Sequence, residues 1–151
     1  MPKVPRRVTT HHDRYDDSAL AQAIDDYDRR RDVFLPDAPK PVAPYSHAVE
    51  AGAFVFVTGQ LATDPDDDSL LVPPGIEAQT RKVMDNLSRV LKGCGLAFAN
   101  VVCVRIFLTD FKGDYARMNE ICSTYFAADK RPARTTVGVT ALPGAGLSRS
   151  T

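Results

Sequence analysis

The chain has 151 residues, of which 44% are hydrophobic, so we expect one core of ordinary size, a single domain and an additional tail. Nineteen basic residues balance nineteen acidic ones, which argues against nucleic acid or an anionic membrane as the main partner. The three cysteines lack C-x-x-C spacing and no apolar run approaches the roughly 20 residues of a bilayer span, so we expect a cytoplasmic protein with reduced thiols.

Residues 1–37 differ in composition from the rest of the chain and are predicted to form a polar N-terminal extension with a short helix. Residues 1–17 have too few large apolar groups to bury and are expected to be mobile. Ser18 is the expected N-cap of a short helix, whose negative C-terminal end suits the basic run 29–31. One weak apolar stripe on this helix fits docking or full solvation equally well.

Two acidic or histidine-rich segments have the residue types of a metal site, but we expect no metal and no cofactor. His11 and His12 lie close to three aspartates in a polar tail, where adjacent ligands are not preorganised. The acidic run 64–68 lacks the glycine and the later glutamate of a calcium loop, so it is predicted to be a solvated turn.

Residues 38–151 are predicted to form the main domain, in which strand and helix patterns alternate. The expected elements are a β-hairpin over 45–60, a helix over 75–92, a strand over 100–108, a helix over 114–127 and a strand from about 135. This order predicts an α+β fold, a small mixed β-sheet with two helices on one face. The strand at 54–60 is apolar on both sides and is predicted to lie in a covered sheet. Because helices cover one face only, we expect the other face to be closed by further copies of the chain.

Arg134 is the main candidate for ligand binding. It follows Pro132 and enters the β-branched run 135–139, where a guanidinium held at a strand entrance can clamp a carboxylate through two oxygens. The alternative is an exposed arginine that simply begins a strand. No Asp or Glu follows Asp129, so an acid acting with Arg134 must come from earlier in the chain or from another subunit.

Six segments in register over about residues 38–143 resemble the RidA/YjgF family of reactive-intermediate deaminases. They are Ala43-Pro44-Tyr45-Ser46-His47-Ala48-Val49, Val57-Thr58-Gly59-Gln60, Gln79-Thr80 with Asn86-Leu87, Phe107-Leu108-Thr109-Asp110, Tyr115 to Asn119, and Pro132-Ala133-Arg134. The resemblance implies a chorismate-mutase-like fold and a homotrimeric barrel with ligand clefts between subunits. It also implies hydrolysis of 2-imino acids and enamines, such as 2-aminoacrylate or 2-iminobutyrate, to 2-keto acids and ammonia without metal or cofactor.

The same resemblance assigns roles to individual residues. Arg134 is expected to hold the substrate carboxylate, and Thr136, two residues further along the strand, to face the same pocket. Tyr45, Thr58 and Asn119 match positions that line the family's cleft and offer hydroxyl or amide groups to substrate or water. Alternatively, Tyr45 and Asn119 satisfy buried backbone groups and Thr58 is an ordinary strand residue.

Two departures from the family pattern leave the activity open. The usual final strand is missing, and the position of its water-holding acid aligns with Arg149, which cannot act as a base. The N-terminal extension is also longer than usual and is expected to cover an exposed edge or trimer surface. The rival to an active or impaired deaminase is a non-catalytic trimer that binds small carboxylates as a sensor or partner protein. A third interpretation, RNA cleavage, lacks a basic patch to support it.

Overall fold

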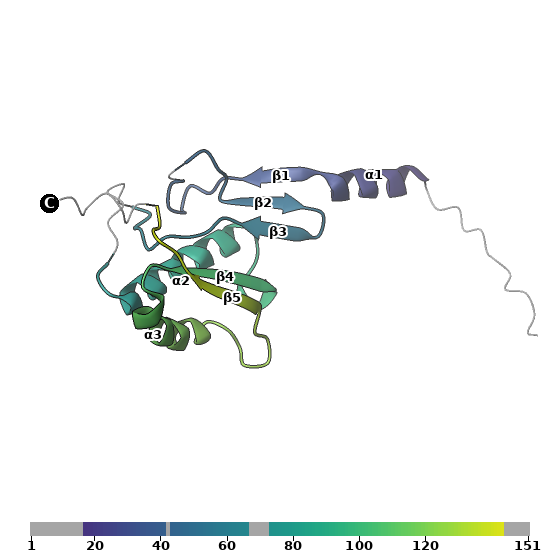
Figure 1. Cartoon of the computed structure of the whole chain (residues 1–151). Coiled ribbons are helices and arrows are strands. Elements are labelled where there is room, and N and C mark those ends of the chain that lie inside the picture. The colour runs from purple at the N-terminus through teal and green to yellow at the C-terminus, as the bar shows by residue number, and fades with distance from the viewer. Residues whose placement is uncertain (1–16, 42, 67–72, 144–151) are drawn as a thin grey trace, which may run out of the picture.

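The computed structural model describes residues 17–41, 43–66 and 73–143 (Figure 1). Helix α1 (Asp17–Asp28) begins one residue before the predicted N-cap Ser18 and is followed almost at once by strand β1 (Arg30–Val33). The basic run lies just past the end of α1, where Arg29 pairs with Asp25 at 3.1 Å, but its other two residues belong to β1. Arg31 instead pairs with Glu50 on the neighbouring strand. The first sheet therefore begins within the segment predicted as the extension.

The predicted hairpin is confirmed and extends β1 into a three-stranded antiparallel sheet. Strands β2 (Ala48–Ala51) and β3 (Phe54–Val57) are joined by a turn at Gly52, whose φ of 57° lies in the left-handed region that glycine adopts without strain. The order is β1-β2-β3, and Val33, Ala48 and Val57 pair across it in register. These three side chains form one apolar face.

The second half of the main domain is a β-α-β unit on a long helix. It comprises α2 (Ile76–Gly93), a short 3-10 turn (Phe98–Asn100), β4 (Cys103–Leu108), α3 (Phe111–Ser123) and β5 (Ala133–Gly138). Strands β4 and β5 are parallel, as expected when a helix connects them. Helix α3 starts three residues before the predicted Asp114, because Asp110 caps it by accepting the Gly113 N–H at 3.0 Å.

Helix α2 holds the two sheets together. Val90 packs with Val33 and Ala48 of the first sheet, whereas Met84 packs with Leu108 and Met118 of the second half. The α+β class is confirmed, but the described strands form two sheets, not one. Within the described ranges, no helix is long and apolar enough to cross a membrane.

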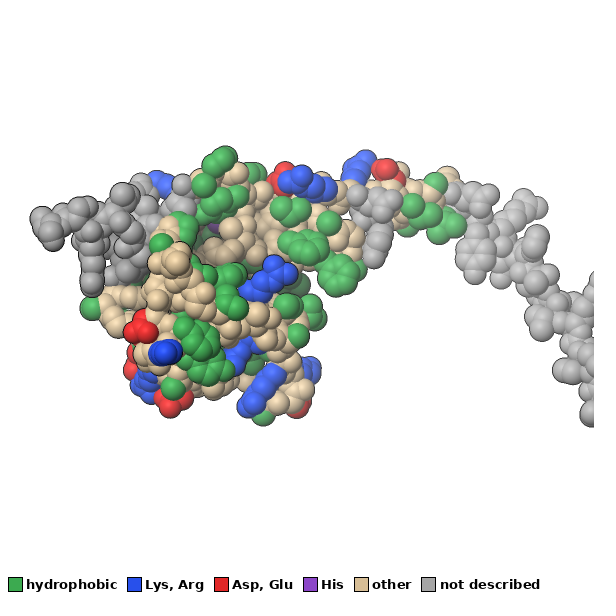
Figure 2. All heavy atoms as spheres, viewed as in Figure 1, with side chains coloured by type: hydrophobic (Ala, Val, Ile, Leu, Met, Phe, Trp, Pro, Cys, Tyr) green, Lys and Arg blue, Asp and Glu red, His purple; other side chains and the backbone are tan. Residues whose placement is uncertain are grey.

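The face of the strands opposite the helices is open in the single chain. Phe54 and Phe56 on β3 are 59% and 63% exposed, and Phe107 on β4 is 48% exposed. Figure 2 shows hydrophobic side chains at the surface over these strands. The prediction that β3 is covered on both sides therefore fails for one chain alone. An aromatic face of this kind is typical of a surface that meets another protein.

An exposed ion-pair network joins α2 to α3. Arg117 on α3 donates to Glu77 on α2 from Nε at 3.1 Å and also from its terminal nitrogen, and it reaches Glu120 at 2.8 Å. Arg81 donates to the same Glu77 carboxylate at 3.1 Å. The hydrogen bonds from Arg117 and then Arg81 lower the pKa of Glu77. Charge on Glu77 therefore favours the folded chain.

This network predicts an acid-dependent contribution to stability. Because the folded pKa of Glu77 lies below its unfolded value, the stabilisation is complete above roughly pH 5 and is lost as the pH falls below about 4. We expect Arg117→Ala to reduce the dependence of thermal stability on pH across that window. The matched control is Lys112→Ala, another exposed cation, on α3. Equal pH dependence in both variants would rule out the network as the source.

Candidate functional site

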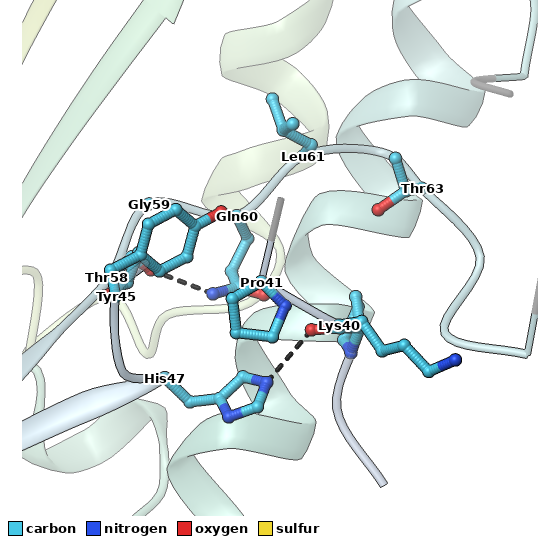
Figure 3. Close-up of a pocket in the computed structure, with 10 residues that line it drawn as sticks. Lys40, Pro41, Tyr45, His47, Thr58, Gly59, Gln60, Leu61 and Thr63 are labelled. Atoms are coloured by element: carbon cyan, nitrogen blue, oxygen red, sulfur yellow. Dashed lines mark hydrogen bonds between the residues drawn. The ribbon is translucent and has the colours of Figure 1, made fainter. Parts of the chain in front are cut away.

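A shallow, open depression lies where the first sheet ends. Tyr45 and Thr58 both line it, together with Lys40, His47, Gln60 and Thr63. Figure 3 shows the Tyr45 ring beside the Thr58 to Gln60 backbone, with His47 and Lys40 along the same hollow. Tyr45 precedes β2 and Thr58 follows β3, so the hairpin brings the two together across twelve intervening residues. We call this group the hydroxyl half-site.

Thr58 is held firmly within the hydroxyl half-site. Its Oγ1 donates to the Ser46 carbonyl at 2.7 Å, and its N–H donates to the His47 carbonyl at 3.1 Å. Gln60 Nε2 donates to the Thr58 carbonyl at 2.9 Å. Since the hydroxyl proton is committed to Ser46, the Thr58 oxygen is left to accept a hydrogen bond. It therefore suits a donor such as water or an iminium N–H.

Two buried side chains fix the loops on either side of the depression. His47, 6% exposed, accepts the Leu35 N–H on Nδ1 at 3.0 Å and places Nε2 3.0 Å from the Pro39 carbonyl. Asn86, 1% exposed, donates from Nδ2 to the Leu61 carbonyl at 2.9 Å and to the Thr63 carbonyl at 2.8 Å. Both walls of the hollow are thus tied to the core.

The second candidate group lies between β5 and α3. Arg134 pairs with Val104 in the parallel ladder and is exposed. Burial raises the pKa of the Cys122 thiol on α3, and the charge of the adjacent Arg134 guanidinium and its hydrogen bond to the thiol oppose part of that rise. Asn119 is three residues before Cys122, so both occupy one side of α3, and Asn119 is half-buried. We call Arg134, Asn119 and Thr136 the arginine half-site.

Thr136 shares a strand face with Arg134, as predicted. It pairs with Ile106, one of the β4 side chains that pack toward the helices. Its Oγ1 is buried and has no hydrogen-bond partner among the residues the structure describes. A buried hydroxyl of this kind is a polar group left without compensation in the single chain.

The two half-sites do not meet within one chain. The residues that line the depression include neither Arg134 nor Asn119 nor Thr136, and the two groups belong to separate sheets. The depression offers the hydroxyls of Tyr45 and Thr58, and the second group offers the Arg134 guanidinium and the Asn119 amide. Within a single chain, therefore, neither half-site is a complete binding site for a charged substrate.

Sequence reasoning missed the supporting residues His47, Gln60 and Asn86. His47 and Asn86 lie within predicted elements, and their hydrogen-bond partners are 8 to 25 residues away. Two signals were available: all three residues belong to the segments that resemble the RidA/YjgF family, and His47 and Asn86 are polar residues among apolar neighbours.

Three features of the sequence analysis lie outside the described residues. They are Arg149, which aligns with the family's acid, the pair His11 and His12, and part of the acidic run 64–68. Among the residues that the structure describes, no group of three metal-ligating side chains is found.

Comparison with known proteins gives one consistent family. Residues 35–148 match the family model described as Endoribonuclease L-PSP. A RutC family protein of Pyrococcus horikoshii is 40% identical over 74% of this chain and 86% of its own length. The mouse 2-iminobutanoate/2-iminopropanoate deaminase is 36% identical over 76% and 82%.

Solved structures agree with the sequence comparison. The crystal structure of RidA from an Antarctic Psychrobacter bacterium matches with a TM-score of 0.69 and 33% identity, covering 75% of this chain and 89% of its own. The fold, the aligned motifs and these relatives lead to the same conclusion, that the chain belongs to the RidA/YjgF family.

Proposed function

We propose that this protein hydrolyses reactive 2-imino acids and their enamine tautomers to 2-keto acids and ammonia. The observation that carries the proposal is the exposed Arg134 guanidinium beside Cys122 of α3, on a chain in which Tyr45 and Thr58 line a hollow. A guanidinium recognises the carboxylate that all such substrates share. The mouse relative named as a deaminase supports the same reaction.

The complete site, in this proposal, forms between copies of the chain in a homotrimer. Arg134 of one subunit faces Tyr45 and Thr58 of the next, which unites the two half-sites. The open aromatic face of β3 and β4 supports such an assembly, because Phe54, Phe56 and Phe107 gain burial there. Burial of these rings provides the driving force for trimer formation. The threefold symmetry then repeats the same cleft at each interface between subunits.

The chemistry asks little of the protein beyond positioning. A protonated imine is already electrophilic at carbon, so water adds to form a tetrahedral carbinolamine, which loses ammonia to give the 2-keto acid. Arg134 orients the carboxylate, and the imine carbon with it, before attack. Thr58 can accept a hydrogen bond from the iminium N–H or the attacking water, and Tyr45 borders the same space. The proposal includes no metal or cofactor.

One observation favours the rival function, a trimer that binds small carboxylates without turning them over. Residues 135–151 contain no Asp or Glu, and the position of the family's water-holding acid aligns with Arg149, which cannot act as a base. The same clamp would then serve as a sensor for 2-keto or amino acids. A reducing cytoplasm suits either role, since Cys94, Cys103 and Cys122 are free thiols.

One assay separates the two functions. 2-Iminobutyrate is generated in situ with an amino-acid oxidase, and its decay is followed with and without the protein. We expect faster decay in proportion to protein concentration. Decay at the buffer rate, combined with binding of 2-ketobutyrate by calorimetry, would establish the non-catalytic function. Absence of both decay and binding would overturn both proposals.

A further inference from the structure

The Leu35 and Pro39 contacts of His47 define its protonation state. Nδ1 accepts the Leu35 N–H at 3.0 Å, so this nitrogen carries no proton. Nε2 lies 3.0 Å from the Pro39 carbonyl, which can only accept, so Nε2 carries the proton. The backbone thus selects the neutral ring with its proton on Nε2. The ring is buried and meets Phe34 edge-on at 6.5 Å between centroids.

The segment that His47 holds is a wall of the hydroxyl half-site. Leu35 and Pro39 bracket a turn closed by the Ala38 N–H to the Leu35 carbonyl, and Pro39, Lys40 and Pro41 all line the depression. His47 itself follows Tyr45 by two residues. The ring therefore joins the wall that carries Lys40 to the segment that carries Tyr45.

We propose that His47 is a positioning residue that holds residues 35–41 against the hydroxyl half-site only while its ring is neutral, so that acidification opens this wall. A second proton would sit on Nδ1 and face the Leu35 N–H, placing two donors against each other. The Leu35 N–H would lose its acceptor and the turn its anchor. The inference rests on the proposed function in that the wall borders the substrate.

Other charged and titratable groups lie near His47 and the turn that it holds. Lys40 and Tyr45 line the same depression, and Asp32 on β1 accepts a long hydrogen bond from Ser46 at 3.4 Å. Asp37 lies within the turn itself. All of these groups are retained when His47 is replaced, so a comparison of the wild type with a variant at position 47 distinguishes the imidazole from them.

A glutamine at position 47 provides a matched variant. Its amide offers one acceptor and one donor at a separation similar to that of the imidazole nitrogens, and it does not titrate. His47→Gln can accept the Leu35 N–H and donate to Pro39 at every pH, whereas His47→Ala can do neither. The Gln variant thus separates loss of the contacts from loss of titration.

The test follows the backbone amide of Leu35 by ¹⁵N NMR in the full chain, at pH values from about 8 to 5. In the wild type we expect the His47 ring nitrogens to report the Nε2–H form at pH 8, with exchange of the Leu35 amide at least about tenfold faster, after correction for intrinsic rates, at pH 5. In His47→Gln the corrected rate should stay constant. In His47→Ala it should be fast throughout.

Affinity for 2-ketobutyrate provides the second readout. The wild type is expected to lose at least about fivefold more affinity than His47→Gln on acidification. A proton on Nδ1 at neutral pH, or Leu35 exchange with the same pH profile in wild type and Gln variant, would overturn the proposal. Failure to bind 2-ketobutyrate in any protein would count against the proposed function, while the Leu35 amide would still decide the role of His47.

Discussion

Arg134→Ala is expected to lower kcat/KM for 2-iminobutyrate by about a hundredfold or more, because it removes both charge-assisted hydrogen bonds to the substrate carboxylate. The guanidinium lies exposed on β5, where its loss leaves little unsatisfied in the core. Folding should therefore survive. Steady-state kinetics with in situ imine generation provide the measurement, with thermal melting as the check on folding.

Two further variants show whether the effect arises from the clamp. Arg134→Lys keeps the charge but loses the planar fork, so we expect an intermediate loss of about tenfold. Arg89→Ala removes an exposed arginine of α2 that does not line the depression, and it should leave kcat/KM unchanged. If Arg134→Ala left kcat/KM as unchanged as Arg89→Ala, Arg134 would be only an exposed residue at the start of a strand, without a role in substrate binding.

Asn86→Ala is expected to cost about 2 to 4 kcal/mol in the free energy of unfolding, because two buried carbonyls lose their donor and a small cavity is left. Those carbonyls, of Leu61 and Thr63, belong to the loop that lines the hydroxyl half-site. Urea unfolding gives the measurement, provided that the slope of the transition stays the same.

Asn100→Ala is the matched control for this prediction. The Asn100 side chain is exposed and accepts one hydrogen bond, from the Ala97 N–H at 3.0 Å, at the start of a short 3-10 turn. We expect its loss to cost about 0.5 to 1 kcal/mol. A cost for Asn86→Ala no larger than this would mean that the loop at 61–63 does not depend on the Asn86 amide.

Local signals in the sequence predicted the elements whose causes are local. The hairpin follows from Gly52 between two apolar runs, and α2 follows from its apolar face and from Gly75, whose φ of 81° suits glycine. Strand β1 was missed because only Val33 of its four residues is buried. Its strand conformation comes from pairing with β2, including the Arg31–Glu50 ion pair, which no local pattern reveals.

The candidate site divides in the same way. Arg134 and Thr136 were placed on one strand face because strand residues two apart share a face, and the ladder with Val104 and Ile106 agrees. The supporting contacts of His47 and Asn86 could not be predicted, since they join residues brought together only by the folded core. The assembly that would unite the half-sites stays a prediction, argued from exposed Phe54 and Phe56.

The central claim is that Arg134 of one subunit and Thr58 of another act on the same substrate. Mixing two inactive variants tests it most directly: Arg134→Ala and Thr58→Val chains are unfolded together in equal amounts and refolded. A cleft is intact when its arginine comes from a Thr58→Val chain and its threonine comes from an Arg134→Ala chain. Each condition is met with a probability of about one half, so about a quarter of wild-type activity should return. No recovery in mixed trimers verified by mass would contradict a shared site.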